Sequence, residues 1–453
     1  MCFVASDPGL KRSMNQSEFK LPGAGSPRVL LTGTNRWAAP ARIAIGLAKA
    51  GCEVSAICPT PAHPLLKTRV VRQTFPYGGP LSLDSLAAAI EATRPAIIIP
   101  CDDRGVRHLH NLHSRQCSEG NSGSEIAKLI ERSLGAPESY PIVSSRYRFM
   151  QIADEEGIRV PPFSEIRAVD DFDSWSALQS FPWVLKADGT WGGGGVRFAE
   201  TRRRAEKFFR ELTRATRGWE MMKRLILNRD RVRNWAWRDR SQPSITVQSR
   251  IQGRPANCAV VCREGRVLAG IGVEVISALG LQGPAIVVRV VKNSDMMQAA
   301  KRIARRLELS GFFGLDFMIE DGTDLTYLIE MNPRCTPLSH LQLGTGRDMV
   351  GALHAQLVGQ SFRATPSVTQ SEMIAYFPQA WTSQSEFLRT SFQDLPEDEP
   401  ELIEVLLHPW SERSLLGRAI DALRSVGKTD LPAQGYVFPA AVAALAASET
   451  SEV

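Results

Sequence analysis

Two short apolar segments on either side of an acidic turn are the feature that most limits how this chain can fold. The first segment is residues 314–317, the turn is residues 320–323, and the second segment is residues 329–334. Apolar segments around such a turn predict a β-hairpin. Residues two apart on a strand face the same way, so Glu330 and Asn332 should project together, and Asp316 on the partner strand can reach the same face.

These three side chains form a candidate metal site. Carboxylate and amide oxygens are the ligands that Mg²⁺ prefers, and the phosphates of a nucleotide can fill its remaining positions. Arg334 follows directly and adds a positive charge. The alternative is a hairpin with a solvated polar face, and the hairpin alone does not decide between the two.

A second segment, upstream of the hairpin, favours phosphate binding. Lys186 closes an apolar stretch at residues 182–188, and four glycines follow: Gly192, Gly193, Gly194 and Gly195. Glycines let the backbone approach an anion and present N–H groups to it, and a lysine supplies a compact positive charge. The run is not a Walker loop, since no Gly-Lys-Ser/Thr follows it, and it does not match the dinucleotide fingerprint. A flexible hairpin tip is the alternative interpretation.

Together the two segments resemble the ATP-grasp superfamily of ATP-dependent ligases, over roughly residues 28 to 360. The resemblance implies that Lys186 contacts the phosphates of ATP. It also implies that Asp316, Glu330 and Asn332 hold Mg²⁺, or Mn²⁺ in its place. Arg334 would hold phosphate or the reacting acyl group, which makes Arg334 and Lys186 the candidate catalytic residues.

The resemblance extends to a basic residue that opens the ATP-binding region. In the family this residue lies on a helix before a Gly-Ile-x-x-Pro sequence, which stands here at residues 157–161. Arg146 is the better match and Arg148 the fallback, while a solvated surface arginine is the alternative for either.

The strand at residues 246–251 resembles the segment that lines the adenine pocket. The family often carries a glutamate on this strand and another acid shortly after it for the ribose. Here Pro-Ala-Asn at residues 255–257 replaces the second acid, which leaves the ribose contact open. The candidate adenine contacts are Gln248, Ser249, Arg250 and Ile251.

The N-terminal third predicts a parallel α/β unit, because apolar strands alternate with helices. The expected strands are residues 29–33, 53–57 and 96–100, and the expected helices are residues 40–50 and 83–93. Asp102 and Asp103 follow a strand's carboxyl end, where open sheets bind their ligands. They are candidate substrate contacts, with helix capping as the simpler alternative. His340 and Arg347, beyond the hairpin, are further candidate substrate contacts.

The expected fold class is therefore α/β, of the α+β ATP-grasp kind. A parallel-sheet domain should precede a lid, a core with a mixed or antiparallel sheet, and a small C-terminal appendage. The expected units are a flexible arm at 1–27, a pre-ATP-grasp domain at 28–140, an ATP-grasp domain at 141–365 (lid about 160–245, core about 246–365) and the appendage at 366–453.

Composition narrows the environment and the partners. The net charge of +6 is modest for 453 residues, so it does not indicate nucleic-acid binding. No apolar run approaches the about 18 residues of a membrane helix, and the first 27 residues lack a signal peptide's apolar core. Eight scattered cysteines without a Cys-x-x-Cys pair predict reduced thiols in a cytoplasmic protein. The basic, Trp-containing segment at 201–240 favours a solvated helix face over an anionic partner. A homodimer is compatible with the sequence.

The family resemblance implies a reaction. The γ-phosphate of ATP passes to a small-molecule carboxylate, and an amine or another nucleophile then displaces phosphate from the acyl phosphate. One alternative is a carboxylating or carbamoyl-phosphate-forming enzyme of the same superfamily, which would consume bicarbonate. The other is a nucleotide-binding regulatory protein without turnover.

Overall fold

The computed structural model describes residues 25–59, 63–78, 81–118, 124–190, 195–214, 243–280, 283–363 and 365–408. Several sequence predictions fall outside these residues. They are the flexible arm as far as residue 24, residues 215–240 of the basic segment, most of the glycine run (Gly192, Gly193 and Gly194), and the last 45 residues of the expected appendage, 409–453.

The N-terminal unit is a parallel sheet covered by helices, as predicted. The strands β1 (Arg28–Thr32), β2 (Glu53–Cys58), β3 (Val71–Pro76) and β4 (Ile97–Pro100) lie in the order β3-β2-β1-β4, and every pair is parallel. The helices are α1 (Ala38–Lys49), α2 (Ser82–Thr93), α3 (Asp103–Ser118) and α4 (Glu125–Leu134). The strands β1, β2 and β4 are buried almost throughout, which explains why they read as unbroken apolar runs.

The second sheet is formed by the region for which the sequence predicts a lid, and we refer to it below as the lid. Its strands are β5 (Phe163–Ile166), β6 (Trp183–Ala187), β7 (Val196–Ala199) and β8 (Ile245–Ser249), in the antiparallel order β5-β8-β6-β7. The helices α7 (Asp171–Leu178) and α8 (Arg202–Thr213) pack on one face, where Leu185 and Val247 are buried. Because strand residues alternate between faces, Lys186 and Gln248 occupy the opposite face. This sheet ends at Ser249, just past the expected boundary.

The third sheet is the core, with the order β13-β12-β9-β10-β11-β14-β15. Its strands are β9 (Gly253–Arg263), β10 (Arg266–Ala278), β11 (Ala285–Val290), β12 (Gly311–Glu320), β13 (Thr326–Asn332), β14 (Met373–Tyr376) and β15 (Phe392–Asp394). All neighbouring strands are antiparallel except the parallel pair β14–β15. The helices α6 (Arg146–Glu155) and α10 (Ser294–Arg306) cover one face, and α11 (Met349–Leu357) covers the other together with α1.

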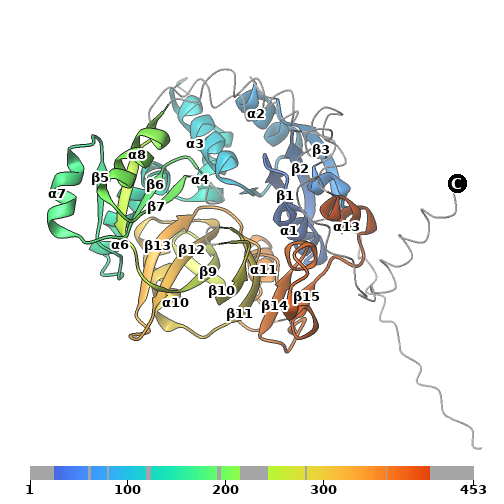
Figure 1. The fold of residues 1–453 in the computed structure, drawn as a ribbon. Coiled ribbons are helices and arrows are strands. Elements are labelled where there is room, and N and C mark those ends of the chain that lie inside the picture. Colours follow the sequence, from blue (N-terminus) through green and yellow to red (C-terminus); the bar gives the residue numbers. More distant parts are fainter. Residues whose placement is uncertain are drawn as a thin grey trace, which may run out of the picture.

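Figure 1 shows the three sheets arranged around a central space, with the C-terminal strands beside the N-terminal unit. The remaining short elements are η1 (Pro64–Lys67), η2 (Pro137–Ser139), α5 (Tyr140–Val143), α12 (Gln379–Thr382), η4 (Glu386–Arg389) and α13 (Pro400–Leu407).

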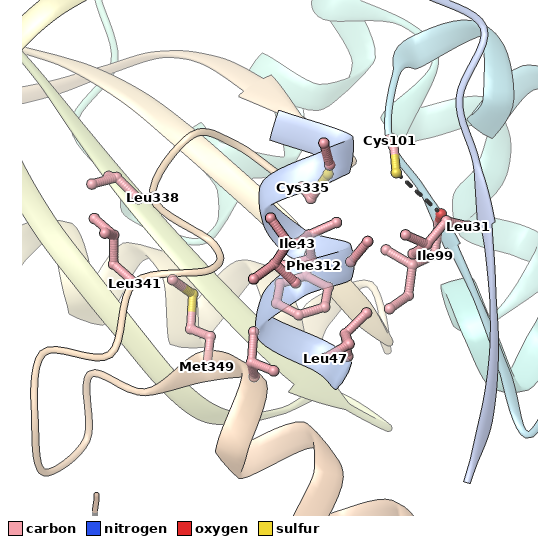
Figure 2. Close-up of a cluster of buried hydrophobic side chains, with 14 of the residues drawn as sticks. Leu31, Ile43, Leu47, Ile99, Cys101, Phe312, Cys335, Leu338, Leu341 and Met349 are labelled. Atoms are coloured by element: carbon pink, nitrogen blue, oxygen red, sulfur yellow. Dashed lines mark hydrogen bonds between the residues drawn. The ribbon is translucent and has the colours of Figure 1, made fainter. Parts of the chain in front are cut away.

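One apolar cluster joins the N-terminal unit to the core. Figure 2 shows part of this cluster, to which Ile43 and Leu47 of α1, Leu31 of β1 and Phe312 of β12 all belong. The α13 side chains Leu402, Ile403 and Leu406 belong to the same buried cluster. The chain from residue 366 to residue 407 is thus not the separate appendage that the sequence suggested. It adds two strands to the core sheet and packs on the N-terminal unit.

Two composition-based predictions can be compared with the described residues. Their cysteines are all free thiols, and all but Cys117 are buried, as predicted. None of the described helices is long and apolar enough to cross a membrane.

Buried neutral histidines should make folding sensitive to acid. Burial lowers the pKa of His63 to about 4 and the pKa values of His108 and His110 to about 3. In the unfolded chain these groups titrate near pH 6.5. Between pH 6.5 and 4 the unfolded state therefore binds protons that the folded state does not, so stability falls as the pH falls.

We expect the urea midpoint of unfolding to decrease progressively from pH 7 to pH 5. The decrease should be smaller in His108→Gln, which has one such proton-binding group fewer. A midpoint that does not change over this range would contradict the expectation.

Candidate functional site

The three sheets enclose a cleft of about 880 Å³. Its walls come from α3 of the N-terminal unit, from α6, from β6 and β8 of the lid, and from β12 and β13 of the core. A volume of this size belongs to the range that small-molecule sites occupy.

The predicted hairpin is confirmed and forms one wall. In the β12–β13 ladder Asp316 lies directly opposite Glu330, and Gly314 lies opposite Asn332. The Nδ2 atom of Asn332 donates a hydrogen bond of 2.9 Å to Asp316 Oδ2, so the three predicted ligands do share one face. The register shifts between Asp316 and Phe317. This bulge falls at Ile329, whose carbonyl oxygen accepts a 2.7 Å hydrogen bond from Lys186 Nζ.

Two cations of the ATP-grasp region converge on Glu330. Arg146 Nη2 lies 2.8 Å from Glu330 Oε1, and Lys186 Nζ lies 4.0 Å from Oε2. Burial by itself raises the pKa of Glu330, but the attraction of Arg146 and Lys186 outweighs it and the pKa is lowered. The carboxylate is therefore held in its charged form.

Asp316 is in the opposite situation. Burial, followed by repulsion from Glu330, raises its pKa. Two amides, Asn257 Nδ2 and Asn332 Nδ2, donate hydrogen bonds to its oxygens. The other end of Asn257, its Oδ1 atom, is buried and has no hydrogen-bond partner among the residues that the structure describes. Glu330 is thus balanced by two cations, whereas Asp316 has no ion pair among the described residues and lies beside an unused amide oxygen.

Asn257 is a site residue that the sequence did not reveal. It enters the site because β9 pairs with β12 in a register that places it opposite Asp316. The two residues are 59 positions apart, so no local pattern could have indicated the contact.

Arg146 connects the hairpin to the start of the glycine loop. It begins α6, where the Ser145 side chain caps the helix. Its guanidinium donates to the carbonyl oxygens of Ala187, at 2.5 Å, and Thr190, at 3.1 Å. Arg148 is exposed and does not line the cleft. The geometry thus favours Arg146 over the fallback.

Lys186 is deeply buried within the same cleft, since only 4% of it is exposed. Burial lowers the pKa of its ammonium group to about 8, although Glu330 opposes the shift. At the other end of the loop Gly195 returns to the sheet, where its carbonyl oxygen accepts from Ala187 N at 3.0 Å.

The expected adenine contacts all line the cleft: Gln248, Ser249, Arg250 and Ile251. The Nε2 atom of Gln248 is buried and has no hydrogen-bond partner in the described part of the chain. Ser249 Oγ donates to Gln179 Oε1 at 2.8 Å, and the Arg250 guanidinium lies 5.4 Å from the centre of the Phe198 ring. The two latter side chains are already held by contacts with other described residues, whereas Gln248 brings an unpartnered amide nitrogen to the cleft.

The two aspartates after β4 have different roles. The carboxylate of Asp102 accepts hydrogen bonds from Thr34, Asn35 and Gly105, so it takes the capping role that was the simpler alternative. Asp103 lines the cleft and accepts from Arg334 Nε at 3.0 Å. Arg334 also donates to Asn332 Oδ1 at 3.2 Å, and its guanidinium lies 5.2 Å from the centre of the Trp37 ring.

The remaining two candidates do not reach this cleft. His340 lies against Gly46 of α1 and pairs with Asp394 at 3.0 Å in a separate cavity of about 310 Å³. Arg347 is not among the residues that line the main cleft. The chain turns away from the site after Arg334 to reach α11, so the prediction of substrate contacts at these two positions is corrected.

The chain is similar in sequence and in fold to known proteins. A family model described as an ATP-grasp domain matches residues 143–337. The chain is 22% identical over 317 residues to the carbamoyl phosphate synthase large chain of Xylella fastidiosa (strain Temecula1), covering 66% of this chain and 26% of the relative. It is 23% identical over 231 residues to a carbamoyl-phosphate synthase of Methanobrevibacter smithii, covering 49% and 56%. The chain therefore spans about a quarter of the first relative and about half of the second.

Two solved structures share the fold. One is the N5-carboxyaminoimidazole synthetase of Staphylococcus aureus in complex with ADP, with a TM-score of 0.52, 13% identity and coverage of 76% of this chain and 81% of that one. The other is the biotin carboxylase of Campylobacter jejuni in complex with an ATP analogue, with a TM-score of 0.53, 15% identity and coverage of 74% and 72%.

Proposed function

The chain belongs to the ATP-grasp superfamily through residues 143–337, and from this premise we propose that it is an ATP- and Mg²⁺-dependent ligase. It would activate a carboxylate as an acyl phosphate for attack by an amine or another nucleophile. The observation that carries the proposal is the carboxylate pair Asp316 and Glu330, whose members lie opposite each other in the ladder, with Arg146 and Lys186 within reach of Glu330.

The donor set of the hairpin suits Mg²⁺. Asp316, Glu330 and Asn332 offer carboxylate and amide oxygens, which are hard ligands. The unpartnered Oδ1 of Asn257 adds an oxygen beside them. Among the described residues no group of three or more His, Cys, Asp or Glu is placed to hold a metal, so phosphate oxygens would complete the coordination. When bound, Mg²⁺ would neutralise negative charge on the phosphates.

The chain's own groups would do the positioning that phosphoryl transfer requires. Lys186 and the backbone N–H groups of the glycine loop would hold the phosphates. Gln248 and its neighbours would contact the adenine base. Arg334 would face the reacting carboxylate. Because Asp103 and Asn332 already fix its guanidinium, Arg334 needs little reorganisation to stabilise developing negative charge.

Bicarbonate as the acid is a second candidate, because two of the curated relatives are carbamoyl phosphate synthases. A regulatory protein without turnover is less well supported, since the oxygen ligands and both cations converge in one cleft. The free buried thiols favour the reducing environment of the cytoplasm.

An ADP-release assay separates these functions. We expect ADP release to require Mg²⁺ or Mn²⁺ together with a carboxylate, and to increase when an amine is added. The assay should screen amino acids, dipeptides and small dicarboxylates in bicarbonate-free buffer. Release with bicarbonate alone would favour the carboxylase, and calorimetric ATP binding without any release would favour the regulatory protein.

A further inference from the structure

The first turns of α3 form the wall of the cleft that faces the lid. Asp103, Arg104, Val106 and Arg107 all line the cleft. The start of this helix is firmly held, because Asp102 accepts hydrogen bonds from Gly105 and from the backbone and hydroxyl of Thr34. The backbone from which the side chains of this wall extend is therefore held in place relative to β4 and the N-terminal sheet.

Three cationic residues that line the cleft, and Arg334 beside it, are already engaged within the described part of the protein. Arg146 and Lys186 lie at Glu330, Arg334 is paired with Asp103, and Arg250 lies over Phe198. Each of these side chains would bind the nucleotide or the reacting carboxylate from a position that its contacts within the protein already fix.

Arg107 is different. It is half-buried, and within the described part of the chain its guanidinium has no hydrogen bond or ion pair. Its Nη1 atom approaches the loop after β6 so closely that a Cβ at Gly189 would stand 3.8 Å from it. A cation that lines a cleft without an ion-pair partner among the described residues is typical of a binding position for an anion.

The nucleotide is not the best match for this anion. Residues 143–337, which match the ATP-grasp domain, do not include α3. The phosphates of a nucleotide would face Lys186 of β6 and Arg146 of α6. An anion at Arg107 would instead belong to the substrate side of the cleft, next to the Asp103–Arg334 pair.

Spacing indicates how large such a substrate would be. Asp103 and Arg107 are four residues apart on a helix, which puts their Cβ atoms about 5–6 Å apart. With its reacting carboxylate at Arg334, a substrate could reach Arg107 with a second anionic group about one helical turn away. We propose that the acid substrate is a short dicarboxylate, or an amino acid of that kind, whose distal carboxylate binds Arg107. This inference rests on the proposed ligase function.

The test compares glutarate with pentanoate, which has the same chain length but a single carboxylate. Calorimetry is carried out on the full chain in the presence of Mg²⁺ and a non-hydrolysable ATP analogue, and ADP release is measured in parallel. We expect glutarate to bind at least about 10-fold more tightly than pentanoate, the effect of a charge-assisted hydrogen bond.

Variants test whether Arg107 is the residue that binds the second carboxylate of glutarate. Arg107→Ala should weaken glutarate binding about 10- to 100-fold while the KM for ATP stays within about 2-fold, and Arg107→Lys should recover part of the loss. The matched control is Arg115→Ala on the same helix, where Arg115 pairs with Asp84 outside the cleft. It should leave both constants unchanged.

Three results would overturn the inference. They are equal binding of the two acids, no binding of glutarate, and an Arg107→Ala variant whose KM for ATP rises while glutarate binding is retained. Because binding is measured without turnover, these outcomes are independent of whether the ligase function holds. An enzyme that turns over monocarboxylates as well as dicarboxylates would refute this inference alone, whereas failure to release ADP with any acid would refute the proposed function.

Discussion

Glu330→Gln is expected to lower the rate of ADP release at least about 100-fold, the usual cost of losing one group that stabilises a transition state. Glu330 lies opposite Asp316, its pKa is lowered by Arg146 and Lys186, and it would supply the carboxylate ligand that is held firmly in its charged form. Glutamine has nearly the same shape, so packing at the hairpin should be preserved.

The control for this variant is Glu404→Gln, on the exposed side of α13. Both variants should unfold close to the wild-type temperature, and only Glu330→Gln should lose turnover. Near-wild-type ADP release by Glu330→Gln would refute the assignment of the metal ligands.

Lys186→Ala should raise the dissociation constant for ATP about 10- to 100-fold, because it removes a charge-assisted contact to phosphate. The pKa of about 8 for Lys186 in the free protein adds a pH signature. The ammonium group is charged below this pH and loses its proton above it, so the ATP affinity of the wild-type protein should fall as the pH rises through 8.

Calorimetry over pH 7 to 9 measures both effects. Lys186→Arg keeps its charge and should show a flatter pH profile than the wild type, while Lys301→Ala on the exposed side of α10 should behave as the wild type. An unchanged dissociation constant in Lys186→Ala would count against the phosphate role.

The features that the sequence predicts well are local. Successive side chains on a strand point to opposite faces, so the sequence alone is sufficient to place Asp316, Glu330 and Asn332 on one face of the β12–β13 hairpin. The unbroken apolar strands of the N-terminal unit likewise identify a parallel sheet.

The features that it misses depend on contacts between distant segments. Asn257 joins the site through the register of β9 against β12, and Arg107 through the approach of α3 to the lid. The strands β14 and β15 have four and three residues, which are too few to show the alternation of apolar and polar residues that identifies a strand. His340 was expected in the cleft because it follows Arg334 in sequence, but the chain direction after the hairpin takes it to α1.

The most direct test is a crystal structure of the protein with Mn²⁺ and a non-hydrolysable ATP analogue, using the anomalous signal of manganese to locate the metal. We predict an anomalous peak between Asp316, Glu330 and Asn332, with the phosphates extending to Lys186. A peak elsewhere, or a nucleotide bound away from Lys186, would contradict the account.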